Sequence, residues 1–467
     1  MRTFMRRLFR RGPGQAPARR PAYRVRPAVE PLEERALLSI AGWGGDTVST
    51  IDPLDPPPSA GPSDVIVLPP PETVPGHACG DKVRIELDKN NRQILITGTN
   101  HDDVVTVHEK TKVKKGQVVT VITVKGRTEG GAKFEEKFTV QPGELVQVVF
   151  WGCDGDDRFD NRTASLRAVA FGGDGDDRLQ GGALGDALFG QGGTNRLEGR
   201  NGVDFYDVGA GGRIVDQDGK NFDAKRWTVD GMTYGDIVQG TSCSCWLLSA
   251  LGAVAATRPG HLEKLIAYKG DGQYEVTLYD ITQKAWVKEQ IYFDGLTTDA
   301  EPGFRDPVKG QVEFWTVLFH RAYFQHYKLP PDCGGQEHPA PRTEAGALTT
   351  LTGQPAETHK LADDQSADKD ATLKAIQKAL ADKRGVVVGT VVDRQPSTSL
   401  LVANHCYQVL AIHQSLCCGT VVELYNPWGF DTRDNKVVWG ENDGVIVISW
   451  EDFVQSIGTY TLGSKPQ

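Results

Sequence analysis

Hydrophobic and polar residues alternate in short segments between residues 81 and 150 of this 467-residue chain. Alternation with a period of two is typical of β-strands that bury one face, and the Gly, Asn and Asp residues between the segments favour turns. The pattern therefore predicts a β-rich module. Its strands are expected at residues 83–87, 94–96, 104–107, 118–121 and 145–149.

A nine-residue repeat rich in Gly and Asp follows these strands. Residues 172–180 read Gly-Gly-Asp-Gly-Asp-Asp-Arg-Leu-Gln, further units begin at Gly181, Gly190 and Gly199, and an earlier unit covers residues 152–160. Position eight of every unit is apolar or aromatic, and position six is Asp or Asn. A short fixed period predicts stacked turns that point their position-eight side chains into a shared core.

The hydrophobic pattern changes after the repeats, because segments with the period of an α-helix precede segments that alternate. This order predicts an α+β region in which helices come early and most strands come late. Helices are expected at residues 245–256, 312–327 and 372–384, an antiparallel hairpin at residues 274–294, and further strands from residue 386 onward.

A candidate nucleophile lies where a polar turn meets the first of these helices. Cys245 follows Ser244, whose hydroxyl is expected to cap the helix. The partial positive charge of a helix N-terminus favours a thiolate, which is the nucleophilic form of cysteine. Gln239 stands six residues earlier, so its side-chain NH₂ and the Cys245 backbone N–H are expected to form an oxyanion hole. A lone cysteine is more often a buried thiol, so the assignment needs a base nearby.

Residues suited to be the base and its orienting partner occur far downstream. His405 stands near the start of a predicted strand, 160 residues after Cys245, and Asn426 follows His405 by 21 residues at the end of the next strand. A neutral Asn can hold a His tautomer by accepting its N–H without adding charge. Cysteine, histidine and asparagine in this order indicate acyl transfer through a thiol.

These residues together resemble the calpain family of papain-like cysteine peptidases, over residues 208–460. Calpains usually carry Gly-Asp directly before the nucleophile, where this chain has Cys243-Ser244. The stretches that carry the resemblance are Gln239-Gly240, Cys245-Trp246-Leu247-Leu248, Glu313-Phe314-Trp315, Asn404-His405, Asn426-Pro427-Trp428-Gly429 and Ser449-Trp450-Glu451-Asp452-Phe453.

The resemblance implies a papain-like fold with a helical half, a β half and the site between them. It further implies a calcium-dependent endopeptidase that hydrolyses protein or peptide substrates. In that interpretation Cys245 attacks, His405 transfers the proton, Asn426 orients His405, and Gln239 helps to hold the oxyanion. The alternative is a non-catalytic cell-surface or matrix-binding protein that keeps an inactive peptidase fold.

The nine-residue repeats resemble the calcium-binding β-roll of the RTX proteins. Carboxylate and carbonyl oxygens are the ligands that Ca²⁺ prefers, so the position-six residues Asp157, Asp177, Asp186 and Asp204 are the expected metal ligands. The array is degenerate, because Leu184 replaces a repeat glycine. The alternative is therefore a calcium-free β-solenoid that serves as a spacer.

Charge is distributed unevenly along the chain. The net charge is −9, yet residues 1–26 contain nine Arg and no acidic residue, so the rest of the chain is strongly acidic. An acidic body argues against a nucleic-acid partner. No run of 18 apolar residues occurs, which argues against a transmembrane segment. The eight cysteines are sparse and lack the spacing of a disulfide framework, so none is expected.

The N-terminal residues have no apolar stretch of signal-peptide length. The segment Pro31-Leu32-Glu33-Glu34-Arg35-Ala36-Leu37-Leu38-Ser39 nevertheless resembles the leader of many exported planctomycete proteins, which implies an extracellular or cell-surface location in a bacterium. The alternatives are a basic tail and an intracellular protein. The expected organisation is a multidomain chain, with a basic leader at residues 1–39, a Pro-rich linker at 40–80, a β-rich module at 81–207 whose repeats at 152–207 form a short β-roll, and the peptidase domain at 213–467.

Overall fold

The computed structural model describes residues 79–215, 221–240, 242–297, 301–308, 311–330, 340–361, 369–391, 396–415, 419–431 and 442–466. The predicted leader and almost all of the predicted linker lie outside these residues. Along the described part of the chain, no helix is long and apolar enough to cross a membrane.

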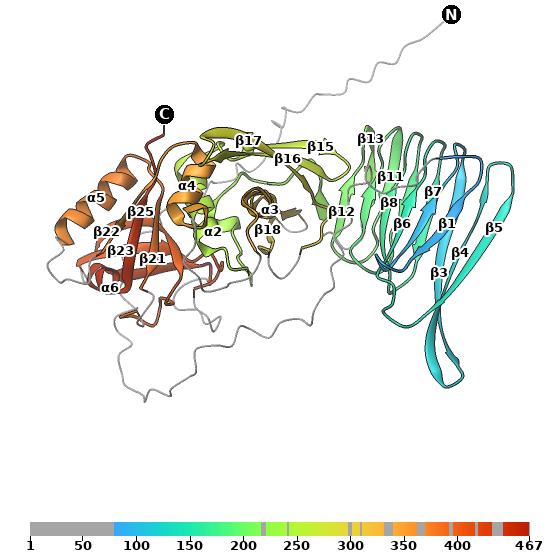
Figure 1. The fold of residues 1–467 in the computed structure, drawn as a ribbon, viewed down its shortest axis with the longest axis horizontal. Helices are drawn as coiled ribbons and strands as arrows, with labels where there is room; N and C mark the ends of the chain where they lie inside the picture. Colours follow the sequence, from blue (N-terminus) through green and yellow to red (C-terminus); the bar gives the residue numbers. More distant parts are fainter. Residues whose placement is uncertain are drawn as a thin grey trace, which may run out of the picture.

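A solenoid of stacked β-turns forms the first part of the described chain (Figure 1). It consists of two facing sheets whose central strands pair in parallel. The nine-stranded sheet has the order β1 (Arg84–Asp88), β2 (Gln93–Thr97), β6 (Gln147–Trp151), β8 (Arg167–Phe171), β10 (Ala187–Phe189), β12 (Asp204–Asp207), β14 (Asn221–Asp223), β19 (Gln311–Glu313) and β18 (Arg305–Val308). The seven-stranded sheet has the order β13 (Gly211–Ile214), β11 (Thr194–Glu198), β9 (Arg178–Gln180), β7 (Arg158–Arg162), β3 (Asp103–Lys114), β4 (Gln117–Thr128) and β5 (Lys133–Val140).

Each nine-residue unit contributes one strand, and consecutive units alternate between the two sheets. A period of nine leaves room for one short strand and one turn, which is why the units stack as rungs. The position-eight side chains are at most 1% exposed and lie in one core between the sheets, which confirms the predicted inward position. They are Phe159, Leu179, Leu188, Leu197 and Tyr206.

The solenoid continues into the region that follows it. The boundary expected at residues 207–213 falls between β12 and β14, which are neighbouring parallel strands of the nine-stranded sheet. The sequence of β14 no longer follows the repeat, so the extra rung could not be recognised from its pattern.

Side chains of the solenoid also pack against the region that follows it. The ring centroids of Phe205 and Phe222 lie 5.7 and 5.6 Å from that of Phe293. Arg167 of the solenoid also forms a buried ion pair with Asp294, with 2.8 Å between its Nη1 and the Asp294 Oδ2. The two regions therefore share one hydrophobic core.

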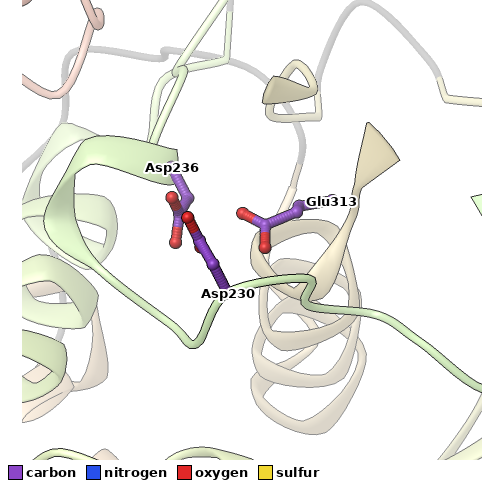
Figure 2. Close-up of side chains that lie close together, drawn as sticks. All are labelled: Asp230, Asp236 and Glu313. Atoms are coloured by element: carbon purple, nitrogen blue, oxygen red, sulfur yellow. The ribbon is translucent and has the colours of Figure 1, made fainter. Parts of the chain in front are cut away.

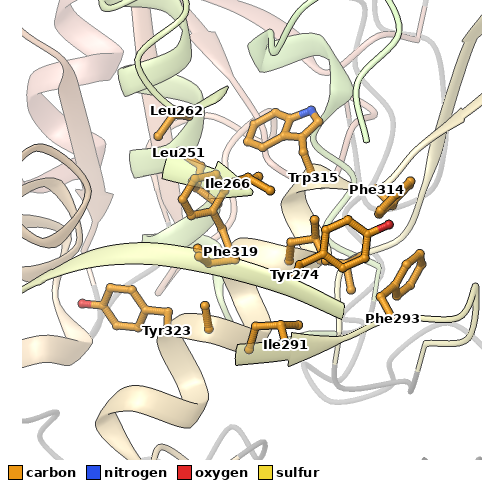
Figure 3. Packing of buried hydrophobic residues seen from close by; sticks show 14 of the residues in the cluster. Leu251, Leu262, Ile266, Tyr274, Ile291, Phe293, Phe314, Trp315, Phe319 and Tyr323 are labelled. Atoms are coloured by element: carbon orange, nitrogen blue, oxygen red, sulfur yellow. The ribbon is translucent and has the colours of Figure 1, made fainter. Parts of the chain in front are cut away.

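Figure 3 shows part of this core, in which Phe293, Phe314 and Tyr274 lie close together. Around it pack three helices and a three-stranded antiparallel sheet, which includes the predicted hairpin. The helices are α2 (Cys245–Thr257), α3 (Trp315–Tyr327) and α4 (Glu344–Thr352), and the strands are β15 (Ile266–Gly270), β16 (Gln273–Asp280) and β17 (Ala285–Tyr292).

The C-terminal part is a six-stranded antiparallel sheet with its own core. Its order is β20 (Glu357–Lys360), β25 (Ile457–Leu462), β21 (Val386–Thr390), β22 (Cys406–Ser415), β23 (Gly419–Tyr425) and β24 (Val445–Ser449), and the helices α5 (Lys369–Ala381) and α6 (Trp450–Ser456) accompany it. Short 3₁₀ turns occur at Tyr234–Asp236, Glu263–Leu265 and Ala340–Arg342. The predicted helices at 245–256, 312–327 and 372–384 correspond to α2, α3 and α5, whereas the pattern did not predict α4.

The expectation that the cysteines form no disulfides is wrong. Cys79 and Cys153 form a disulfide with 6.1 Å between their Cα atoms, and Cys243 is also disulfide-bonded. Cys79 and Cys153 are 74 residues apart in sequence, and the stacked turns bring them together. Spacing along the chain could not reveal this pair, because the fold decides which residues meet.

Candidate active site

The candidate nucleophile stands at the first position of α2, as predicted. Ser244 is the residue that precedes the helix, but its hydroxyl lies 2.8 Å from that of Ser242 and caps no helix N–H. The prediction of a capping hydroxyl is therefore wrong. Residues 246–255 are all buried, which fixes the helix between α4 and the strand β22. A helix held on several sides keeps Cys245 in a defined position.

The strands β22 and β23 bring the other two predicted residues together. The His405 Nε2 lies 3.0 Å from the Asn426 Oδ1, and His405 and Asn426 are 5% and 0% exposed. The same Oδ1 accepts the backbone N–H of Trp428, while the Asn426 Nδ2 donates to the carbonyl of Phe430. These bonds orient the amide with its oxygen toward His405. The ring must then donate from Nε2, which leaves Nδ1 for the thiol.

The surroundings of the Cys245 thiol lower its pKa and so favour the thiolate. A hydrogen bond from the Cys406 thiol lowers the pKa of Cys245 well below its usual value, and a bond and charge interaction with His405 lower it further against the opposing effect of burial. Cys245 is partly buried and lies among groups that stabilise the anion. Since the thiolate is the nucleophilic form, this environment suits nucleophilic attack.

Cys406 is a site residue that the sequence did not reveal. The Cys406 Sγ also lies 3.2 Å from the Glu344 Oε1, at the start of α4. Its interaction with Cys245, its burial and the charge of Glu344 raise the pKa of Cys406 well above its usual value. Cys406 therefore stays protonated, and its single S–H can donate either to the Glu344 carboxylate or to the Cys245 thiolate. The only signal in the sequence was its position next to His405, which did not show where its side chain would lie.

Gln239 lies in the segment that leads to the nucleophile. Its backbone N–H donates to the carbonyl of Pro427 over 2.8 Å, which joins this segment to the turn that carries Asn426. Its side-chain Nε2 donates to the carbonyl of Ser242 over 2.5 Å, and its buried Oε1 has no hydrogen-bond partner among the described residues. One N–H of the side-chain amide is therefore engaged locally. The role of Gln239 at an oxyanion remains a prediction.

Trp428 covers the histidine. The centroids of the Trp428 and His405 rings are 4.7 Å apart, and Tyr407 meets His405 edge-on at 4.9 Å. Aromatic rings around the imidazole exclude water from its bond to Asn426, and a hydrogen bond is stronger where the local dielectric constant is low.

Three carboxylates lie together, two from the segment before the nucleophile and one from the end of β19 (Figure 2). The oxygens of Asp230, Asp236 and Glu313 are within 4.8 Å of one another. Asp236 and Glu313 are buried, and within the described part of the chain no donor reaches the Glu313 Oε2. Burial raises the pKa of Asp236, and burial and the Asp236 charge raise the pKa of Glu313 to about 7.

This acidic cluster fits a hard divalent cation, which is best bound by several carboxylate oxygens. A buried carboxylate oxygen without a donor is costly, and a cation would supply the missing partner. The cluster joins the turn of Tyr234–Asp236 to the last residue of β19, so an ion there would connect the segment before α2 with the start of α3. Sequence reasoning missed it because Asp236 and Glu313 are far apart in the chain.

The four predicted roll ligands lie in two columns along the solenoid. The Asp157 Oδ1 accepts the backbone N–H of Asp103, and the Asp177 Oδ1 accepts that of Asp157, over 2.7 and 2.9 Å. In the second column, Asp186 and Asp204 accept from Ala168 and Asp186 over 2.5 and 2.8 Å. Each carboxylate thus accepts a backbone N–H from the neighbouring turn of the solenoid and stabilises the position of that turn.

These roll carboxylates are almost completely buried. Burial is the largest cause that raises the pKa of Asp157 to about 9, of Asp177 to about 7 and of Asp186 to about 8. Among the residues that the structure describes, none donates a hydrogen bond to the Asp157 or Asp177 Oδ2 atom. The donor set suits a calcium ion, and whether these residues bind one remains a prediction.

A thiol beside an imidazole that an amide orients is the arrangement that papain-like cysteine peptidases use. Residues 218–455 match the family model described as "Calpain family cysteine protease", which covers 238 of the 467 residues. The chain therefore belongs to the calpain family of cysteine proteases.

Several calpains are similar to part of this chain. Human Calpain-9 is 27% identical over 216 residues, which are 43% of this chain and 29% of that protein. The bovine Calpain-1 catalytic subunit is 26% identical over 218 residues (44% and 29%), and the chicken Calpain-2 catalytic subunit is 28% identical over 235 residues (46% and 31%). The chain thus matches about three-tenths of the length of these relatives.

Proposed function

We propose that this protein is a cysteine endopeptidase that cleaves peptide bonds in protein substrates with Cys245, His405 and Asn426. The observation that carries the proposal is the His405–Asn426 hydrogen bond beside a thiol whose pKa is held low. A papain-like arrangement agrees with these positions, because Cys245 begins a helix and His405 directly precedes the strand β22.

The proposed reaction follows from the protonation states. The Cys245 thiolate attacks the substrate carbonyl carbon, and the negative charge moves to the carbonyl oxygen, near the Cys245 N–H and the Gln239 amide. The His405 imidazolium then gives the Nδ1 proton to the leaving amine as the C–N bond breaks. Water, deprotonated by His405, hydrolyses the thioester and restores the thiolate. Asn426 keeps the ring oriented through both steps.

We also propose that Ca²⁺ regulates the peptidase through Asp230, Asp236 and Glu313, and stabilises the solenoid through Asp157, Asp177, Asp186 and Asp204. The cluster supports the first part because the segment that contains Asp236 continues to Gln239, whose side chain contacts the loop before Cys245. An ion at the cluster would neutralise two buried carboxylates, of which the Asp236 charge already raises the pKa of Glu313.

A peptide-hydrolysis assay with the full-length protein tests both proposals. We expect turnover in Ca²⁺, a large loss in chelator, and no turnover by Cys245→Ala. Glu313→Gln should shift the Ca²⁺ requirement at least tenfold, whereas the matched change of the exposed Glu451, Glu451→Gln, should leave it unchanged. Failure of the wild-type protein to hydrolyse peptides or to react with a thiol-directed epoxide would instead support a non-catalytic binding protein. Equal activity in Ca²⁺ and in chelator would contradict the calcium proposal alone.

We further propose that the protein functions outside the cytoplasm. The Cys79–Cys153 disulfide supports this proposal, because such bonds persist mainly in oxidising compartments. Alkylation of free thiols in protein taken from its native source should leave Cys79 and Cys153 unmodified until a reductant is added. Modification of both before reduction would contradict the proposal.

A further inference from the structure

A row of cations crosses the outer face of the seven-stranded sheet. The registers place one residue of each strand directly opposite its neighbours, and six of the seven positions are Arg or Lys. In spatial order the row consists of Arg213, Arg196, Arg178, Arg158, Val104, Arg127 and Lys133. Adjacent strands are about 4.8 Å apart, so the row is roughly 29 Å long.

The row faces solvent. The residues next to it along each strand, such as Phe159, Leu179 and Val105, are at most 1% exposed and point into the core. Successive side chains on a strand alternate between faces, so the cations must point outward. Five of the six are exposed and Arg196 is partly exposed.

Further cations flank the row on the same face. They are Lys110, Lys112, Lys114, Lys125, Lys137 and Arg162, against the acidic residues Asp160, Glu198 and Glu135. The β3–β4 hairpin that carries the first three of these lysines projects from the solenoid in Figure 1. The face is therefore strongly positive in a protein of net charge −9.

The neighbouring acids neutralise only part of this charge. Glu198 pairs with Arg196 and Arg178 at 3.4 and 3.7 Å, and Asp160 pairs with Arg162 at 2.6 Å. Arg158 and Arg127 form no recorded ion pair within the described residues. His108 of β3 lies on the same face. Its pKa is lowered by burial and by the positive charges of Lys125 and Arg162. The histidine thus experiences a net positive environment.

We propose that this face binds a linear anionic polysaccharide, so that the row pairs with successive sulfate or carboxylate groups. Regularly spaced guanidinium groups suit such oxyanions, because each can donate two parallel hydrogen bonds. No Phe, Tyr or Trp lies among the twelve cations on the described part of this face. Single-stranded nucleic acids are usually held by bases that stack on such aromatic side chains, so the described surface lacks the groups that would bind them. Binding would hold the enzyme on a matrix, with the row on the sheet that faces away from the shared core.

The test compares two double variants of the full-length protein that change net charge equally. Arg158→Glu/Arg127→Glu reverses the centre of the row, and Lys264→Glu/Lys374→Glu reverses two exposed lysines of the peptidase region. Binding to heparin, polygalacturonate and neutral dextran is measured at fixed Ca²⁺ over a series of salt concentrations. We expect the wild-type and control proteins to bind a charged polysaccharide with a steep salt dependence. The row variant should bind at least tenfold more weakly with a shallower dependence.

The choice of polysaccharides distinguishes sulfate groups from carboxylate groups as the anions that the face binds. Preference for heparin assigns sulfate, preference for polygalacturonate assigns carboxylate, and both support the proposal. Equal weakening by the two double variants, no binding of either charged polymer, or tighter binding to single-stranded DNA or anionic vesicles would overturn it. The neutralising pair Arg158→Gln/Arg127→Gln and an unchanged melting temperature guard against misfolding, because neither residue belongs to the active site or the core.

Discussion

The solenoid and the peptidase region use buried polar residues in opposite ways. In the solenoid one role recurs on successive turns, because Asp157, Asp177 and Asn195 each accept a backbone N–H from the preceding turn. In the peptidase region a role belongs to one residue, since among the described residues His405 alone interacts with both Asn426 and Cys245. Repetition should make single changes in the solenoid mild, and uniqueness should make them severe at the active site.

The largest effect is therefore expected from His405→Ala. Loss of the base should reduce kcat by roughly 10⁴- to 10⁶-fold, the scale found when members of such a catalytic unit are removed. The free energy of unfolding should change little by comparison. Peptide turnover and epoxide labelling of Cys245 measure the effect, and thermal melting checks the fold. Labelling at mildly acidic pH that does not depend on His405 would contradict the proposed triad.

The same contrast explains what the sequence could predict. The solenoid repeats every nine residues, so its inward positions and strands follow from local pattern alone. Cys245, His405 and Asn426 are predicted from residue type, order and motifs that resemble those of calpains, and their catalytic roles stay predictions. The geometric relation of Cys406, Glu344 and Asp236 to the site depends on how distant strands and helices pack. No local period carries that information, and the Cys79–Cys153 disulfide escaped prediction for the same reason.

The second largest effect concerns the core that the two regions share. Phe222 is 1% exposed and lies within 6.4 Å, between ring centroids, of Phe205, Phe293 and Phe314. Phe222→Ala should cost about 3–5 kcal/mol of unfolding free energy. Both the solenoid and the peptidase activity should be lost at a lower denaturant concentration. Circular dichroism and residual activity, followed in parallel, measure this.

Phe134, a partly buried residue of β5 at the far end of the solenoid, provides the control. Phe134→Ala should affect peptidase activity far less than Phe222→Ala does. If instead Phe222→Ala left the denaturation of activity unchanged, the two regions would fold separately. The boundary predicted at residues 207–213 would then be supported.

A smaller effect is expected at the second thiol. Cys406→Ala removes the S–H that stabilises the Cys245 thiolate, so the pKa of Cys245 should rise. Labelling of Cys245 at acidic pH should slow roughly tenfold, the effect of losing one hydrogen bond to a charged group. Cys406→Ser keeps a donor and should slow labelling less. A rate–pH profile identical to that of the wild type would show that His405 alone controls the thiol.

The smallest effect is expected for one rung of the solenoid and depends on pH. Burial raises the folded-state pKa of Asp157 from 3.8 to about 9, so between these values the folded protein binds more protons than the unfolded chain. Stability without calcium should then fall as pH rises from 4 toward 9. Asp157→Asn removes the buried charge and keeps an oxygen acceptor, as Asn195 does for the N–H of Asp177 at 2.8 Å. At pH 8 in chelator the variant should therefore melt a few degrees higher than the wild type, about 2–4 °C for each kcal/mol gained.

Added Ca²⁺ should favour the ionised carboxylate and raise the melting temperature of the wild type more than that of the variant. Asp174→Asn, at an exposed aspartate of the same solenoid, should change neither response. A wild-type melting temperature that rises from pH 5 to pH 8 in chelator would show that Asp157 is stabilised as an anion by the fold itself.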